Sequence, residues 1–302
     1  MALVVGLISG TSMDGIDACL VEIRPSPNTD ETIDEHDLEM RLLQFLTKPY
    51  PPAVREGLVR LCSGGEGERG VLGDVCRYNY LLGQLFAEAA DEVVTRAGHS
   101  MSDITAIGSH GQTVCHLPQP RPLLHGYSVS SSLQLADPGV IAGRCGVTTV
   151  GDFRVADIAL GGQGAPLIPY LDKTILQKHH TKTGGVGMLL NIGGISNITA
   201  LLPVSQELIG FDCGPGNVLI DSMMKKLYGV EFDKDGLMAL SGCVNQRLLD
   251  ALVMKTRDYT DREPPKSLGK EEFGEDYEEL ISAHRTDGGL MSQDIIATLT
   301  DC

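Results

Sequence analysis

The pattern that most restricts the fold is an apolar strand, a glycine-rich turn and a second strand, and it occurs twice. The first copy spans residues 3–23 and turns at 10–15, and the second spans 186–202 and turns at Gly193-Gly194. Each copy is followed by a third strand and a helix. Such a repeat predicts an α/β protein with two related domains, each a mixed sheet with helices on both faces, that face each other across a cleft.

The glycine-rich segment 161–166 (GGQGAP) is the clearest break in the middle of the chain. It predicts two domains, residues 1–160 and 161–302. Hydrophobic periodicity predicts further elements on either side of it. These are strands at 40–47, 104–107, 147–150 and 208–211, and helices at 51–62, 71–97, 133–145, 217–227 and from 290 onward.

Composition excludes several classes of protein. The 302 residues carry a net charge of −16, so nucleic acid is not an expected partner. No apolar run is long enough for a membrane span, and the N-terminus lacks the basic region of a signal peptide. The eight cysteines form no C-x-x-C pair and are expected to be free thiols. We therefore expect a cytoplasmic protein.

The first glycine turn, residues 9–15 (SGTSMDG), predicts a phosphate site. It is not a P-loop, which ends in Gly-Lys-Ser/Thr and opens a helix. Small residues leave backbone N–H groups free to meet phosphate oxygens, and Asp14 could hold Mg²⁺. The alternative is an ordinary hairpin, although such a turn needs only two special residues.

Two motifs in the second half have the same character. Residues 191–197 (NIGGISN) form a second glycine turn, for which a plain hairpin is an equal alternative. Asp212 follows the strand at 208–211 and precedes the loop CGPGN. A carboxylate at a strand end is a common catalytic position in α/β folds. Asp212 could instead only cap the helix that begins near Asn217.

Residues 108–113 (GSHGQT) place polar groups at a predicted strand end, where they could bind a sugar. A Ser–His hydrolase is a distant alternative, because neighbouring strand residues point to opposite faces. A metal site at His110, Cys115 and His116 lacks zinc spacing. Arg154 could pair with a ligand carboxylate through its guanidinium, or could form a structural ion pair between domains.

Six motifs together carry a resemblance to a known family. SGTSMDGID, GSHGQT, DFR…DIALGGQGAPL, LNIGGISN, GFDCGPGN and PPKSLGKEEF resemble the motifs of the anhydro-N-acetylmuramic acid kinases, in that family's order and over nearly the whole chain. The family belongs to the superfamily of actin, sugar kinases and Hsp70. The resemblance therefore implies two actin-like (RNase H-like) domains.

The resemblance also implies an activity. The chain would use ATP and Mg²⁺ to open the 1,6-anhydro ring of anhydro-N-acetylmuramic acid with water and phosphorylate O6. The product would be N-acetylmuramic acid 6-phosphate, in cell-wall recycling. Asp212 matches the family's catalytic base, and residues 10–17 match its ATP segment.

The motifs and the resemblance give these candidate residues. For ATP and its phosphates they are Gly10, Thr11, Ser12, Met13, Asp14, Gly15, Ile16, Asp17, Asn191, Gly193, Gly194, Asn197, Gly214 and Gly216. For the sugar they are His110, Gln112, Asp152, Arg154 and Gln163. Asp14 is the candidate metal ligand. The partner is a small amino sugar, and a homodimer is left open.

One departure from the family creates an alternative. Family members continue beyond the helix that begins near Leu290, whereas this sequence ends at Cys302. The resemblance then implies an incomplete second domain. Three hypotheses follow: an active anhydrosugar kinase, a catalytically impaired nucleotide-binding remnant of the family, and a related sugar kinase with another acceptor.

Overall fold

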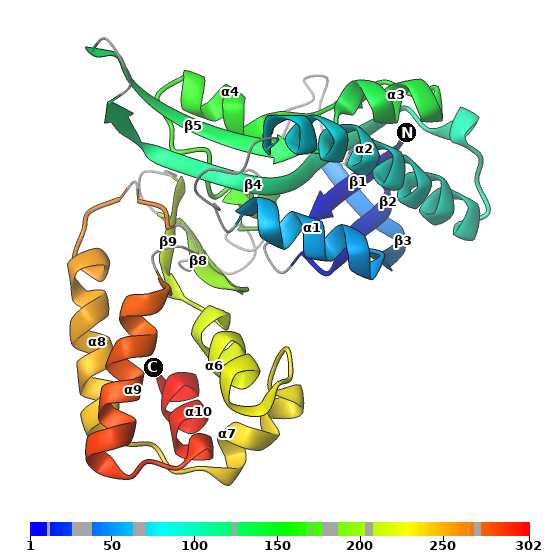
Figure 1. Ribbon diagram of the computed structural model, residues 1–302. Coiled ribbons are helices and arrows are strands. Elements are labelled where there is room, and N and C mark those ends of the chain that lie inside the picture. The colour runs from blue at the N-terminus through cyan, green and yellow to red at the C-terminus, as the bar shows by residue number, and fades with distance from the viewer. Residues whose placement is uncertain are drawn as a thin grey trace. The chain divides into compact units, whose positions relative to one another are not determined.

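The computed structural model of the chain describes residues 1–10, 13–25, 38–62, 71–122, 126–169, 171–176, 187–202, 208–264, 266–268 and 273–302. Within them the chain divides into two compact units, Met1–Leu167 and Ile168–Cys302 (Figure 1). The eight cysteines are free thiols. None of the helices in the described ranges has the length and hydropathy to cross a membrane.

Unit 1 is built on a mixed sheet. Its strands are β1 (Ala2–Ser9), β2 (Gly15–Pro25), β3 (Leu38–Pro49), β4 (Ala106–Pro122), β5 (Ser128–Leu135) and β6 (Thr149–Val150). The order is β3-β2-β1-β4-β5, and β6 also pairs with β4. Strands β1, β2 and β3 form an antiparallel meander, whereas β4 runs parallel to β1. This arrangement confirms the predicted α/β class and the predicted mixed sheet in unit 1.

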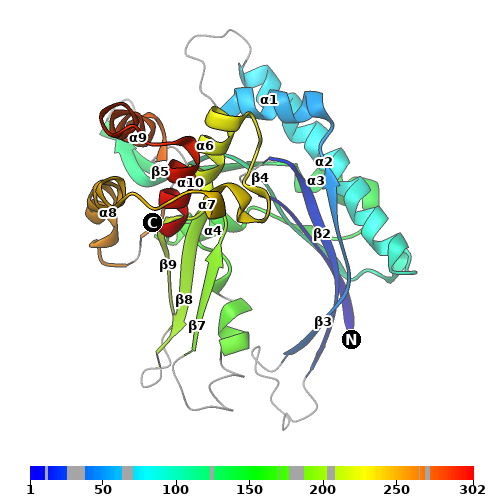
Figure 2. The ribbon, with the colours of Figure 1, turned by 90° about the horizontal axis from the view of Figure 1, so that it is seen from below.

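Helices cover one face of this sheet (Figure 2). They are α1 (Pro52–Cys62), α2 (Val71–Arg96) and α3 (Pro138–Cys145). Helix α2 buries Leu82, Phe86 and Ala90, whose spacing of four places them on one side of the helix. In β1, Val5 and Leu7 are buried at every second position. The two periodicities meet in one hydrophobic core.

Unit 2 combines a three-stranded antiparallel sheet with a helical layer. The strands β7 (Gly187–Ile192), β8 (Ile195–Leu201) and β9 (Leu208–Pro215) lie in the order β7-β8-β9. The helices are α6 (Val218–Tyr228), α7 (Leu237–Ser241), α8 (Gln246–Thr260), α9 (Glu275–Gly288) and α10 (Ser292–Asp301). A second core forms among α6, α8, α9 and α10, around Leu248, Leu252, Ile281 and Ile295.

The meander of unit 2 corresponds to β1-β2-β3 of unit 1, with a glycine turn in the first hairpin of each. The surroundings of the first strand differ between the units. In unit 1, β1 lies between β2 and β4, but in the described part of unit 2, β7 pairs only with β8. Met188, Leu190 and Ile192 of β7 are 58%, 59% and 66% exposed, and their alternation places them on one face.

Two predicted elements are wrong in detail, and one helix was not predicted. The expected helix at 133–145 is strand β5 followed by α3, because Asp137 caps the N-terminus of α3 and Pro138 opens it. The expected strand at 104–107 extends through the GSHGQT motif as β4. A short helix, α4 (Phe153–Ala159), begins within the GDFR motif, where no helix was expected.

Candidate active site

Gln112 of β4 contacts both sides of the β1–β2 turn through its side chain. The Ser9 hydroxyl lies 2.7 Å from the Gly15 carbonyl and 2.6 Å from Gln112 Oε1, and its one hydrogen can be donated to either acceptor. Gln112 Nε2 donates to the Gly10 carbonyl at 3.1 Å. Gln112 is fully buried, and its hydrogen bonds support the first glycine turn. Its role as a sugar ligand stays a prediction.

The other residues of this turn divide between exposed and buried positions. Asp14 is exposed, and Met13 has a φ of 53°, which is uncommon for a residue other than glycine. Asp17 accepts a 2.6 Å hydrogen bond from the Thr47 hydroxyl. The side chain of Ile16 is 1% exposed and belongs to the core, so only its backbone is left for the predicted ATP contact. Thr11 and Ser12 lie outside the described residues.

The second glycine turn is bonded to the start of α6. Gly194 O accepts from the N–H groups of Gly216 and Val218 at 2.9 and 3.2 Å, and Gly193 O accepts from Asn217 N at 2.9 Å. A Cβ on Gly216 would lie 2.1 Å from Gly193 O. The hairpin therefore satisfies the N–H groups at the start of α6, and glycine at 216 serves this close packing. The N–H of Gly216 is already bonded to the Gly194 carbonyl in this structure.

Three polar residues form a row across the second sheet. Asn191 of β7 pairs with Asn197 of β8, and Asn197 pairs with Asp212 of β9. Directly paired residues in antiparallel strands have Cβ atoms about 4.5–5.5 Å apart on the same face. Asp212 therefore lies inside strand β9, where the prediction placed it just after the strand. The row places two carboxamides beside one carboxylate.

The carboxylate of Asp212 is oriented by the backbone of a distant segment. Its Oδ2 accepts from the N–H of Leu268 at 2.8 Å, and its own N–H donates to Lys266 O at 3.2 Å. The Tyr259 hydroxyl donates to the Asp212 carbonyl at 2.8 Å. Asp212 is 5% exposed. Because its carboxylate faces Leu268, the alternative that it only caps α6 is excluded. The cap residue Asn217 has no side-chain capping bond.

Lys266 fixes this segment from within. Its ammonium donates to the carbonyls of Tyr259 and Thr260 at 3.3 and 2.8 Å, at the end of α8. It also lies 5.2 and 5.0 Å from the ring centres of Phe211 and Tyr259. Carbonyls at a helix C-terminus and aromatic faces both favour a cation. This segment lies in the PPKSLGKEEF motif, which carries part of the resemblance. Lys266 and Leu268 were nevertheless not among the candidate site residues.

In unit 1, Arg154 and His110 are in contact. Arg154 Nε donates to His110 Nε2 at 2.9 Å, so α4 is joined to β4. Burial, and next the charge of Arg154, lower the pKa of His110 to about 4, so the ring is neutral near pH 7. Asp152 is exposed with a φ of 58°, and Gln163 accepts from Gln119 at 3.5 Å.

The hydrolase and zinc alternatives receive no support in the described part of the chain. Ser109 is 2% exposed, so its hydroxyl is not positioned to meet a substrate. No group of three or more His, Cys, Asp or Glu side chains with metal-binding geometry occurs among the described residues. Burial, and next the charge of Asp212, raise the pKa of the neighbouring Cys213, which disfavours its reactive thiolate.

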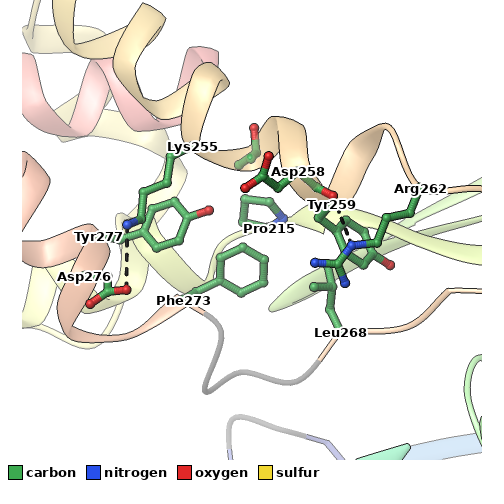
Figure 3. Close-up of a pocket in the computed structure, with 11 residues that line it drawn as sticks. Pro215, Lys255, Asp258, Tyr259, Arg262, Leu268, Phe273, Asp276 and Tyr277 are labelled. Carbon is green, nitrogen blue, oxygen red and sulfur yellow. Dashed lines mark hydrogen bonds and ion pairs between the residues drawn. The ribbon is translucent and has the colours of Figure 1, made fainter. Parts of the chain in front are cut away.

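A pocket of about 250 Å³ lies next to the end of β9 (Figure 3). Among the predicted residues, Gly214 lines it. Lys255 lies 3.8 Å from Asp276, and Arg262 Nε donates to the Asp258 carbonyl at 3.0 Å. The remaining walls are Pro215, Thr256, Tyr259, Leu268, Phe273 and Tyr277. Two cations and two carboxylates balance each other, so the lining does not favour a polyphosphate.

Comparison with known proteins identifies relatives along the whole chain. The family model described as anhydro-N-acetylmuramic acid kinase matches residues 2–302. Proteins of that name from Caldanaerobacter subterraneus subsp. tengcongensis, Shewanella loihica and Salinibacter ruber are 41%, 40% and 39% identical. The alignments cover 99%, 98% and 98% of this chain, and 72%, 72% and 71% of the relatives.

Proposed function

Since this chain belongs to the anhydro-N-acetylmuramic acid kinase family, we propose that Asp212 is its catalytic base. The chain is a kinase that transfers a phosphoryl group to an alcohol acceptor, with ATP as donor and a small sugar as substrate. The observation that supports Asp212 is its environment. Three backbone or hydroxyl contacts fix a nearly buried carboxylate beside Asn197.

The proposed reaction uses one proton acceptor. The Asp212 carboxylate takes a proton from water while the water oxygen attacks the anomeric carbon of the anhydro sugar, as in inverting glycoside hydrolysis. The bond from that carbon to O6 breaks, and O6 keeps the electron pair. O6 then attacks the γ-phosphorus of ATP, and the bond to the β-phosphate oxygen breaks to release ADP. The departing O6 therefore needs no separate acid.

We assign the ATP phosphates to the first glycine turn. Gly10, Met13, Asp14 and Gly15 belong to a turn that the buried Gln112 holds in place, so backbone groups there can be pre-organised. Mg²⁺ is commonly held by one or two carboxylates together with substrate phosphates, where it neutralises charge on the transferred group. The exposed carboxylate of Asp14 fits such a site.

We assign the sugar to Arg154 and its surroundings in unit 1. The guanidinium is planar and can pair with a carboxylate such as the lactyl group of the muramic acid. Asp152, at the start of α4, and Gln163 are the further candidates. A cytoplasmic location and a homodimer remain proposals.

The experiment is release of ADP from Mg-ATP by residues 1–302, with and without 1,6-anhydro-N-acetylmuramic acid. We expect sugar-dependent ADP, and a fall in kcat of about 10²–10⁴-fold in Asp212→Asn, because loss of a general base costs that much. ATP affinity, measured by calorimetry, should persist. The control is Asp235→Asn, an exposed residue in the left-handed region, where Asn is equally tolerated.

Two outcomes would contradict the proposal. Asp212→Asn with wild-type turnover would remove Asp212 from the mechanism. A folded wild-type sample that binds ATP but releases no sugar-dependent ADP would instead favour the impaired nucleotide-binding protein. ADP released with other sugars, but not with the anhydro sugar, would favour a related kinase with another acceptor.

A further inference from the structure

The GGQGAP segment, which the sequence marks as a domain break, folds back on α4. Gly164 N donates to the Asp157 carboxylate at 2.7 Å, and Gly162 N donates to the Asp157 main-chain carbonyl at 2.9 Å. Asp157 therefore holds this turn at two points. A carboxylate that accepts from backbone N–H groups makes a stronger bond than a neutral acceptor.

The glycines of the turn are required by this contact. A Cβ on Gly162 would lie 2.1 Å from Oδ2 of Asp157. Gly164 has a φ of 72°, and a Cβ there would lie 2.9 Å from Ile158. A side chain at either position would displace the turn from Asp157. The spacing of glycines in GGQGAP thus follows from packing against α4.

The Gly162–Gly164 turn also positions Arg154. The Gly164 carbonyl accepts from Arg154 Nη1 at 2.6 Å, while Arg154 Nε donates to His110 Nε2 at 2.9 Å. The guanidinium is planar and its donors have a fixed fork geometry. Two hydrogen bonds from different elements, the glycine turn and β4, therefore define the plane in which it lies.

His110 can accept this bond only in one tautomer. Its Nδ1 lies 3.0 Å from the Gly111 carbonyl, which can only accept, so Nδ1 carries the hydrogen. Nε2 is then a lone-pair acceptor for Arg154. A protonated ring would present a second N–H to the guanidinium and break the contact. The neutral ring at neutral pH meets this requirement.

We propose that Asp157 and His110 are positioning residues that fix the guanidinium of Arg154, Asp157 through the Gly162–Gly164 turn and His110 directly. The inference rests on the proposed role of Arg154 as the contact for the substrate carboxylate. It also changes the predicted role of His110, which acts through Arg154 and does not bind the sugar itself.

The first test compares matched variants of each residue. His110→Phe keeps a ring without an acceptor, whereas His110→Gln keeps an acceptor. Asp157→Leu and Asp157→Asn form the second pair. Loss of a hydrogen bond to a charged group should raise the KM for the anhydro sugar roughly 10- to 100-fold in the Phe and Leu variants. The Gln and Asn variants should recover most of this loss. The KM for ATP should stay within about two-fold throughout.

A general structural role would raise both KM values or lower kcat alone, and the conservative variants would not rescue it. An unchanged sugar KM in His110→Phe and Asp157→Leu would overturn the proposal. Circular dichroism of each variant shows whether it folds. If Asp157→Leu does not fold, the His110 pair decides the outcome.

The second test needs no turnover, so it separates this inference from the proposed function. Imidazole ¹H–¹⁵N NMR of the wild-type protein should show His110 with hydrogen on Nδ1 and a bare Nε2 at neutral pH. In Asp157→Leu the His110 signals should shift, with a smaller shift in Asp157→Asn, whereas those of His99, which lies near Asp103, should not change. A His110 with hydrogen on Nε2, or one that does not respond to either Asp157 variant, would overturn the inference.

Discussion

Gly216 sits where the second glycine turn meets α6, and its replacement by alanine tests the packing directly. A Cβ there would lie 2.1 Å from Gly193 O and 2.9 Å from the Ser196 hydroxyl. The first contact is with backbone and cannot be relieved by a rotamer change. The start of α6 must move away from the hairpin. Three backbone hydrogen bonds, from the N–H groups of residues 216–218 to Gly193 and Gly194, would then break.

Each bond contributes about 0.5–1.5 kcal/mol net, so Gly216→Ala should lower the stability of unit 2 by roughly 2–4 kcal/mol. Urea denaturation followed by circular dichroism measures this change as a lower midpoint at an unchanged slope. The control is Gly143→Ala in α3, where nothing lies within 4 Å of the new Cβ. Helix propensity predicts a gain there of up to about 1 kcal/mol. A Gly216→Ala midpoint equal to that of the wild type would refute the packing argument.

Two further predictions concern unit 1. Gln112→Ala leaves the buried Ser9 hydroxyl and the Gly10 carbonyl without this partner. We therefore expect the free energy of unfolding, measured by urea denaturation, to fall by about 2–3 kcal/mol. An unchanged denaturation midpoint would contradict the supporting role of Gln112. His110 has a pKa of about 4 in the folded chain against an ordinary 6.5, so as the pH falls from 6.5 to 4 the unfolded chain takes up a proton first. The free energy of unfolding should fall by about 2–3 kcal/mol over that window and stay level above it. The plot of this free energy against pH should be flatter for His110→Gln than for the wild type. Parallel curves for the two proteins would contradict the neutral histidine.

The local sequence pattern was sufficient to predict the helices and strands that have a strong hydrophobic periodicity. The helix expected at 71–97 is α2, Val71–Arg96, and the three strands of each meander lie within a few residues of their predicted places. The helix expected at 133–145 was wrong because a helix cap divides that segment. Asp137 and Pro138 begin α3 only because Asp137 folds back on its own helix, and β5 before them keeps its alternation.

The role of Gln112 could not be read from its motif. Its amide meets Ser9 across 103 residues of sequence, through the parallel pairing of β1 and β4. The same holds for Asp212, whose carboxylate is oriented by Leu268, 56 residues away. Glycine spacing in GGQGAP signalled a turn, but its attachment to Asp157 depends on how α4 packs. Residue type suggests candidate groups, whereas the contacts that each one makes depend on long-range pairing.

The open side of β7 has a consequence for how the molecule behaves at high concentration. Among the described residues, β7 has one neighbour, and Met188, Leu190 and Ile192 are exposed along it. A strand with free backbone groups and an apolar face is a template for strands of other molecules. Dilution, or a charged residue placed on that strand, should therefore reduce association through β7 more than added stability in either core would.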